Sequence, residues 1–129
     1  MKRSLLILCA LFFSANVMAG EAEIIFAKFH KNDAGWRVDV TLKHADKGWD
    51  HYANAWRIVD EKGTILGKRV LAHPHTEEQP FTRSLHTARI PADTTVVYVE
   101  ASDLVHGWSK QRVSVDLNTS SGDRYQVTR

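Results

Sequence analysis

The segment GWRVDVTLKH, residues 35–44, alternates between apolar and polar side chains along its length. Trp36, Val38, Val40 and Leu42 fall on one side of an extended chain, and the polar residues between them fall on the other. Because successive side chains of a strand point to opposite faces, this period of two predicts a strand with one buried face. The segment therefore favours an all-β fold in which one sheet face covers a core.

Six more segments have the composition of short strands, and the chain has no strong amphipathic helical pattern. They span residues 22–30, 52–60, 64–72, 81–90, 95–102 and 110–117, with turn residues at EKG (61–63) and PADT (91–94). Seven strands in residues 20–117 predict a single antiparallel β-sandwich of the immunoglobulin or fibronectin type, with a jelly roll or small barrel as the alternative. The polar segment 118–129 is expected to be a loose C-terminal tail.

Residues 1–19 have the pattern of a secretory signal peptide. Lys2 and Arg3 precede the apolar run LLILCALFF (5–13), and VMA (17–19) supplies the small residues of a cleavage site. The run is too short to span a membrane. Cys9 lies inside it after Leu8, so we expect this cysteine to leave with the signal and not to carry a lipid. The sequence thus predicts a periplasmic or secreted protein that begins at Gly20 and has no membrane anchor.

Removal of residues 1–19 changes the composition in two ways. The single cysteine and both methionines lie in that segment, so the mature chain contains no sulfur and can form neither disulfides nor thiolate metal sites. Lys2 and Arg3 are also removed, which leaves 15 basic residues against 15 acidic ones. A chain without net positive charge gives no indication of nucleic-acid binding.

The order of the strands predicts where the histidines gather. Successive antiparallel strands reverse direction, so the segments 45–51, 73–80 and 103–109 should lie at the same end of the sandwich. Five of the seven histidines lie in or beside these segments, and Trp49, Trp108, Asp50 and Asp103 lie with them: His44, His51, His73, His75 and His106. The opposite end receives ordinary turn residues.

The His73-Pro74-His75 motif gives the most specific chemical signal. Pro74 holds the chain extended, which can direct two imidazoles into one space. The sequence predicts a metal site formed by His51, His73, His75 and His106, because imidazole-rich sites suit copper(II), zinc or iron. Copper(II) is favoured over the other two. The alternative is a solvated loop without metal.

Four other residues are candidates for supporting roles at this end. Asp50 or Glu77 could be an additional ligand or could orient a ligating histidine, although simple solvation would explain either. Trp49 and Trp108 could form the wall of a ligand pocket, or could close the open end of the sandwich. Trp36 and Trp56 lie in strand patterns and are expected in the core.

The stretch from GWDHYANAW through GTILGKR and HPHTEEQPFTRSL to a late HG resembles a family of small exported bacterial proteins. The family pattern reads GWDHYA-x-x-W, D-G-x-x-L-G-x-R, HPH-x-x-EQPFTRSL and HG, and it covers residues 48 to about 108. This chain has Lys62 before Gly63 where the family has Asp. The resemblance implies that these segments belong together, and it implies no activity.

The sequence thus favours a periplasmic metal-binding protein that binds, buffers or delivers its ion, with the metal and another periplasmic protein as partners. A second hypothesis is a non-enzymatic adaptor or small-ligand module that uses Trp49 and Trp108. A third is a small metalloenzyme with an open position on a histidine-bound metal. No catalytic residue is assigned, because no nucleophile motif such as G-x-S-x-G surrounds Ser84 or Ser109.

Overall fold

A computed structural model describes residues 20–129, and the predicted signal peptide lies outside these residues. Within this range the chain forms nine strands and no helix. The strands are β1 (Glu23–Asn32), β2 (Gly35–Lys43), β3 (Ala53–Val59), β4 (Ile65–Val70), β5 (Phe81–Ala88), β6 (Val96–Asp103), β7 (Gly107–Asp116), β8 (Ser121–Gly122) and β9 (Tyr125–Thr128). No helix of the described part is long and apolar enough to cross a membrane.

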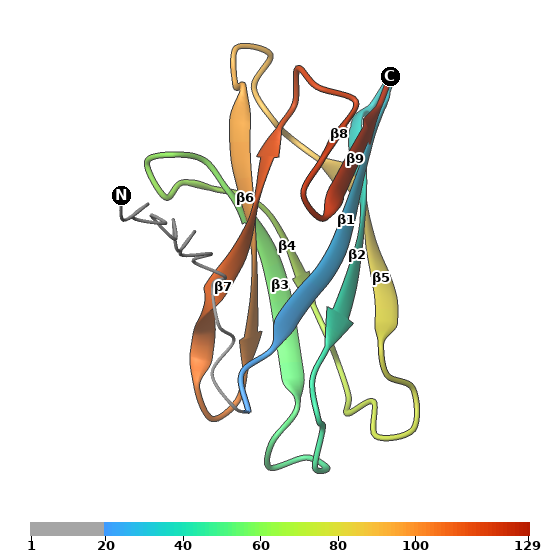
Figure 1. Cartoon of the computed structure of the whole chain (residues 1–129), viewed down its shortest axis with the longest axis vertical. Coiled ribbons are helices and arrows are strands. Elements are labelled where there is room, and N and C mark those ends of the chain that lie inside the picture. The colour runs from blue at the N-terminus through green and yellow to red at the C-terminus, as the bar shows by residue number, and fades with distance from the viewer. Residues whose placement is uncertain (1–19) are drawn as a thin grey trace, which may run out of the picture.

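The strands form two sheets that pack face to face (Figure 1). One sheet has the order β5-β2-β1-β9-β8, and the other has the order β4-β3-β6-β7. The predicted β-sandwich is therefore confirmed, and neither sheet closes into a barrel. The immunoglobulin or fibronectin label stays a prediction.

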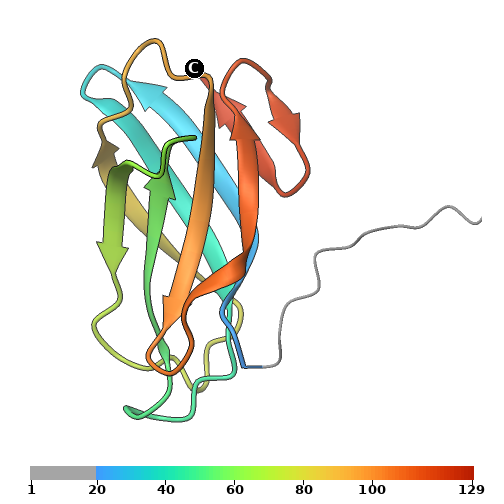
Figure 2. The same cartoon turned by 90° about the vertical axis from the view of Figure 1, so that its left-hand side faces the viewer.

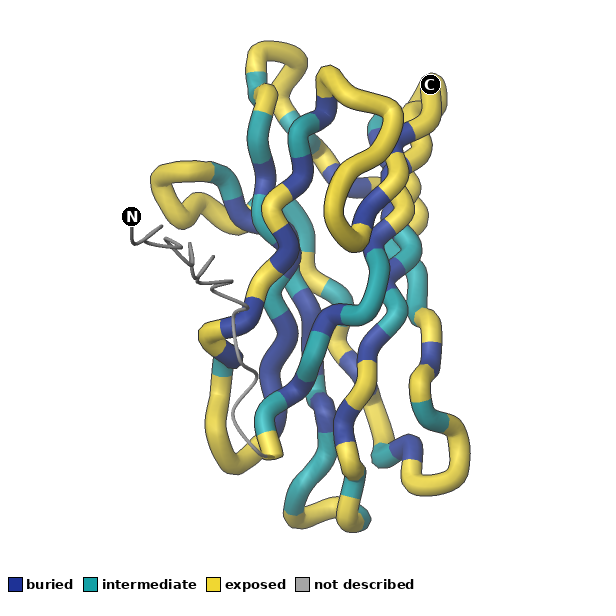
Figure 3. The backbone as a smooth tube through the Cα atoms, viewed as in Figure 1, coloured by how far each residue is buried: buried dark blue, intermediate teal, exposed yellow. Residues whose placement is uncertain are grey.

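The core lies between the sheets and follows the alternation that the sequence predicts. In β2 the side chains of Trp36, Val38, Val40 and Leu42 are buried, as expected for one face of a strand. Buried stretches run through the middle of the strands, and exposed ones gather in the connections (Figure 3). The largest fully buried side chains include Trp56, Phe29, Phe81, Ile24, Leu42 and Ile58.

The C-terminal segment differs from the expected loose tail. Residues 125–128 form β9, which pairs in parallel with β1 from Ala27↔Tyr125 to His30↔Thr128. Tyr125 and Val127 are buried against the core, which explains why this otherwise polar segment stays in place. The fold thus gains two short strands, β8 and β9, beyond the seven that the sequence predicts.

The connections β2–β3, β4–β5 and β6–β7 lie at the same end of the sandwich, at the bottom of Figure 2. We call this the histidine end, defined by residues 44–52, 71–80 and 103–106. The connections β1–β2, β3–β4 and β5–β6 lie at the opposite end (Figure 2). The strand directions therefore place the five histidines of these loops together, as the sequence predicts.

Candidate metal centre

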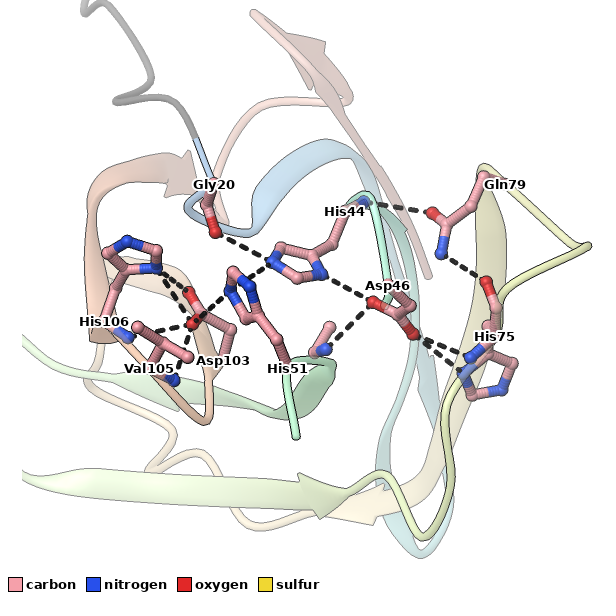
Figure 4. A network of polar contacts seen from close by, with 10 residues as sticks. Gly20, His44, Asp46, His51, His75, Gln79, Asp103, Val105 and His106 are labelled. Atoms are coloured by element: carbon pink, nitrogen blue, oxygen red, sulfur yellow. Dashed lines mark hydrogen bonds and ion pairs between the residues drawn. The ribbon is translucent and has the colours of Figure 1, made fainter. Parts of the chain in front are cut away.

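Three side chains converge at the histidine end (Figure 4). The Nε2 atoms of His44 and His51 lie 3.2 Å apart, and His51 Nε2 lies 3.0 Å from Oδ1 of Asp103. One ligand atom from each of the three residues lies within 4.8 Å of the other two. These residues therefore form a group that could hold a metal ion.

Both sheets contribute to this group. His44 directly follows β2, at the end of one sheet, and Asp103 is the last residue of β6, in the other sheet. His51 lies in the loop that crosses from β2 to β3, and Ala53 at the start of β3 pairs with Asp103. The group thus bridges the two sheets where the sandwich opens, and its geometry depends on the fold and not on one flexible loop.

Hydrogen bonds alone do not satisfy every contact of the Nε2 atoms of His44 and His51. His44 Nε2 also lies 2.8 Å from the carbonyl oxygen of Gly20, which can only accept a hydrogen bond. His51 Nε2 needs its own proton to donate to Asp103. With Nδ1 donating to Asp46, a neutral His44 has an unprotonated Nε2 that can accept from His51 Nε2 at 3.2 Å but cannot donate to the Gly20 carbonyl. A cation between the rings would replace the His51 proton and bind the lone pairs of both Nε2 atoms.

The distances also match those expected around one small ion. Ligand atoms about 2.0–2.1 Å from a transition metal lie roughly 2.9–3.4 Å apart when the bond angles are about 90–110°. The two contacts of His51 Nε2, at 3.2 Å and 3.0 Å, fall within this range. Two of the three ligand pairs therefore already have the spacing that one bound ion needs.

Asp46 holds His44 in its orientation. Its carboxylate is fully buried and accepts a hydrogen bond from His44 Nδ1 at 2.5 Å, which leaves Nε2 facing the centre. The same carboxylate accepts hydrogen bonds from the backbone N–H of Ala53 at 3.1 Å and of His75 at 2.7 Å. A carboxylate on the outer nitrogen of a histidine fixes its tautomer and raises its basicity, as in many metal sites.

Asp103 is held as an anion. Burial alone would raise the pKa of its carboxyl, but hydrogen bonds from the backbone N–H groups of His106 and Val105 and from the His106 ring outweigh it, so the pKa lies below its ordinary value. The backbone bonds measure 2.8 Å and 2.9 Å. The centre therefore contains a negative charge that favours a cation.

His106 lies at the edge of the centre. Its Nδ1 lies 3.0 Å and 3.2 Å from the two carboxylate oxygens of Asp103, and its ring centroid is 5.2 Å from that of His51. Because its Nδ1 donates to Asp103, His106 orients this carboxylate. His106 is exposed, so this side of the centre is open to solvent.

The second histidine of the HPH motif has a different environment. His75 is only 5% exposed, and its ring stacks on Phe81 with centroids 4.0 Å apart. Its Nε2 accepts a hydrogen bond from the Arg83 guanidinium at 2.9 Å. Burial lowers the pKa of His75, and the charges of Arg83 and His73 act in the same direction. The Nε2 lone pair of His75, which a metal would need, therefore accepts the hydrogen bond from the positively charged Arg83.

His73 is exposed, and its ring lies 4.6 Å from the His75 ring, with Nδ1 3.0 Å from the Pro74 carbonyl oxygen. The structure brings His51 and His106 together, and it brings His73 and His75 together. His44 connects the two pairs: it contacts His51, and Asp46 and Gln79 link it to His75 (Figure 4). A common site for all four predicted ligands stays a prediction, and the geometry favours His44, His51 and Asp103.

The four residues considered for supporting roles do not gather in one place either. Asp50 and Glu77 are exposed. Trp49 is 68% exposed and packs edge-on to Tyr52. Trp108 lies on the outer face of the second sheet under the Arg57 guanidinium, 3.8 Å from its ring centroid. A shallow hollow of about 370 Å³ is lined by Trp108, Ser102 and Asp103 among others, and Trp49 does not line it.

The sequence places His44 and Asp103 at the histidine end but not among the predicted ligands, and Asp46 is not among its candidates. The signals were present as His44-x-Asp46 and Asp103-x-x-His106. Both spacings pair an imidazole with a carboxylate across a tight connection, which is the arrangement that orients a ligand.

The comparisons with known proteins give one relative. A protein of Halomicrobium mukohataei named "Putative lipoprotein" is 45% identical over 83 residues, which are 64% of this chain. The chain spans 39% of that protein's length. No family model matches the chain, and no solved structure is similar to it. The relative is consistent with the resemblance stated above and does not show its motifs.

Proposed function

We propose that this protein is an exported metal-binding protein whose ion is held by His44, His51 and Asp103. The observation that carries the proposal is the convergence of two Nε2 atoms and one ionised carboxylate within 4.8 Å, in a geometry where neutral imidazoles leave the contact to the Gly20 carbonyl without a donor. The buried Asp46 supports it, because it directs one of the two imidazoles toward the centre.

Copper(II) is the favoured ion, ahead of zinc and iron. The donors are two imidazole nitrogens and a carboxylate oxygen, and the chain after residue 19 has no sulfur that would favour copper(I) or structural zinc. Divalent copper binds such nitrogen and oxygen sets most tightly among the divalent first-row metals.

The role we propose is binding, buffering or delivery of the ion in the periplasm. His51 and His106 are partly open to solvent, with side chains 19% and 34% exposed, so an ion could enter and leave. Export is supported by the signal pattern of residues 1–19 and by the name of the relative. A lipoprotein is membrane-anchored, whereas we propose cleavage without an anchor, which the mass of the exported protein would test.

The test is a calorimetric titration of the protein of residues 20–129 with Cu(II) and with Zn²⁺. We expect one ion per chain in the wild type and a loss of at least about 100-fold in affinity for His44→Ala and Asp103→Asn. His30→Ala is the matched control, because His30 is exposed at the other end of the sandwich. Equal binding by all four proteins would contradict the proposed site.

A second candidate function is protein docking at the same end. Trp49, Leu104 and Val105 are exposed apolar side chains in the loops that carry His51 and His106. Exposed apolar groups around a polar centre are typical of interaction sites. If no metal binds, the adaptor hypothesis becomes the stronger one, and crosslinking from position 49 in cells would test it.

A further inference from the structure

Gly20 is the first described residue, and it lies against the proposed metal centre. Its carbonyl oxygen is 2.8 Å from His44 Nε2, within the polar network of Figure 4. A β-carbon at this position would lie 2.9 Å from Cε1 of His106 and 3.6 Å from Cε1 of His51. The backbone of Gly20 therefore sits among three histidine rings, too close for a larger residue.

The nitrogen of Gly20 lies near this centre. Covalent geometry keeps the nitrogen and the carbonyl oxygen of one residue on the order of 3 Å apart, whatever the torsion between them. Since the oxygen lies 2.8 Å from His44 Nε2, the nitrogen lies within roughly 6 Å of that atom, and a rotation of this first residue can bring it to a bound ion. Together with the carbonyl oxygen it could close a five-membered ring on a bound ion.

The sequence predicts that this nitrogen changes its chemistry during export. The VMA motif places signal cleavage between Ala19 and Gly20. Hydrolysis adds one water across this peptide bond, so that Ala19 leaves with a carboxylate and Gly20 keeps a free amino group. An amide nitrogen shares its lone pair with the carbonyl, whereas an amine can donate the pair to a metal.

We propose that cleavage after Ala19 completes the metal centre by supplying the α-amino nitrogen of Gly20 as a ligand. This inference rests on the proposed function. The donor set becomes three nitrogens and one carboxylate oxygen, from Gly20, His44, His51 and Asp103, which suits the tetragonal geometry of copper(II). Tight binding is then confined to the exported protein, and the uncleaved chain has a weaker site.

The experiment compares two purified proteins that differ by one residue. One begins at Gly20 with a free amine, and the other retains Ala19, so that the Gly20 nitrogen is an amide. We expect the same melting temperature without metal. We also expect Kd for Cu(II) to be at least about tenfold higher with Ala19, because removing even an outer contact of a ligand costs about 10–100-fold.

A direct readout is electron paramagnetic resonance of Cu(II) bound to protein labelled with ¹⁵N-glycine. Coupling to ¹⁵N is expected in the protein that begins at Gly20 and not in the one that retains Ala19. Equal Kd values and no ¹⁵N coupling would overturn the inference while leaving the proposed function intact. Failure of both proteins to bind copper would overturn both. An exported protein whose measured mass shows another first residue would overturn the inference alone.

Discussion

Two groups of histidines lie at the same end of this sandwich, and the nearest charged partners of their rings have opposite signs. His44, His51 and His106 surround the carboxylates of Asp46 and Asp103. His75, by contrast, is stacked on Phe81 and hydrogen-bonded to the Arg83 guanidinium. The first environment favours a cation, whereas the second disfavours one.

The comparison shows why a histidine motif alone is a weak guide to metal binding. HPH is the most conspicuous pattern in the sequence, yet His75 is buried as part of a packed corner. His44 and His51 are seven positions apart and form no motif, yet their Nε2 atoms face each other. The partner of the second ring nitrogen distinguishes the two cases: Asp46 for His44, and no hydrogen-bond partner for His75 Nδ1 among the described residues.

Removal of Asp46 should have the largest effect, because this carboxylate connects both groups. Asp46→Ala leaves His44 Nδ1 and the backbone N–H groups of Ala53 and His75 without their acceptor. We expect the free energy of unfolding to fall by about 3–5 kcal/mol, measured by urea denaturation. Asp50→Ala, in the same loop but exposed, should stay within about 0.5 kcal/mol of wild type. Equal effects would show that the network does not hold the loops.

Substitutions in the His73-Pro74-His75 motif should change the free energy of unfolding without changing the affinity for metal. His75→Ala removes the stack on Phe81 and the acceptor for Arg83, so we expect a loss of about 2–3 kcal/mol in the metal-free protein. His73→Ala should change stability by about 0.5 kcal/mol or less, since His73 is exposed. Calorimetric affinity for Cu(II) should be similar to wild type in both. A large loss of affinity in the His73 variant would restore the motif as a metal site.

His106 should affect affinity more than folding. His106→Ala removes the ring that orients the Asp103 carboxylate but keeps the backbone N–H that donates to it. We expect Kd for Cu(II) to rise by about 10–100-fold, the usual effect of losing an outer contact of a ligand. Val105→Ala is the control, because only its backbone contacts Asp103. No change in Kd would mean that Asp103 is oriented without His106.

The smallest expected effect is a pH dependence that comes from His75. Burial first, and then the charge of Arg83, holds the pKa of His75 below 6.5 in the folded protein. As pH falls below about 6.5, the unfolded chain binds a proton that the folded protein does not, so stability decreases until pH passes the folded pKa. His75→Gln cannot titrate, so urea denaturation from about pH 8 to 5 should show a smaller loss in this variant. Parallel curves would contradict the assigned shift.

The sequence predicted the sandwich and the histidine end because both depend on short-range patterns. Alternation along residues 35–44 defined a buried face, and strand order defined which loops share an end. β9 was missed because only Tyr125 and Val127 mark it as a strand, within a polar segment. Its parallel pairing with β1 is a contact across most of the chain, which no local pattern specifies.

The side-chain partners could not be predicted in the same way. Which histidine meets a carboxylate depends on rotamers and loop paths at the end of the sandwich. His75 stacks on Phe81, six residues away, whereas His51 reaches Asp103 across 52 residues. Histidine spacing therefore predicts a histidine end and not a ligand set.

The most direct test of the central claim is the position of a bound ion in crystals of residues 20–129 grown with Cu(II), located by anomalous scattering at the copper edge. We predict one strong peak about 2.0–2.1 Å from the Nε2 atoms of both His44 and His51, with Asp103 Oδ1 beside it. A peak between His73 and His75, or no ordered copper at the histidine end, would contradict it.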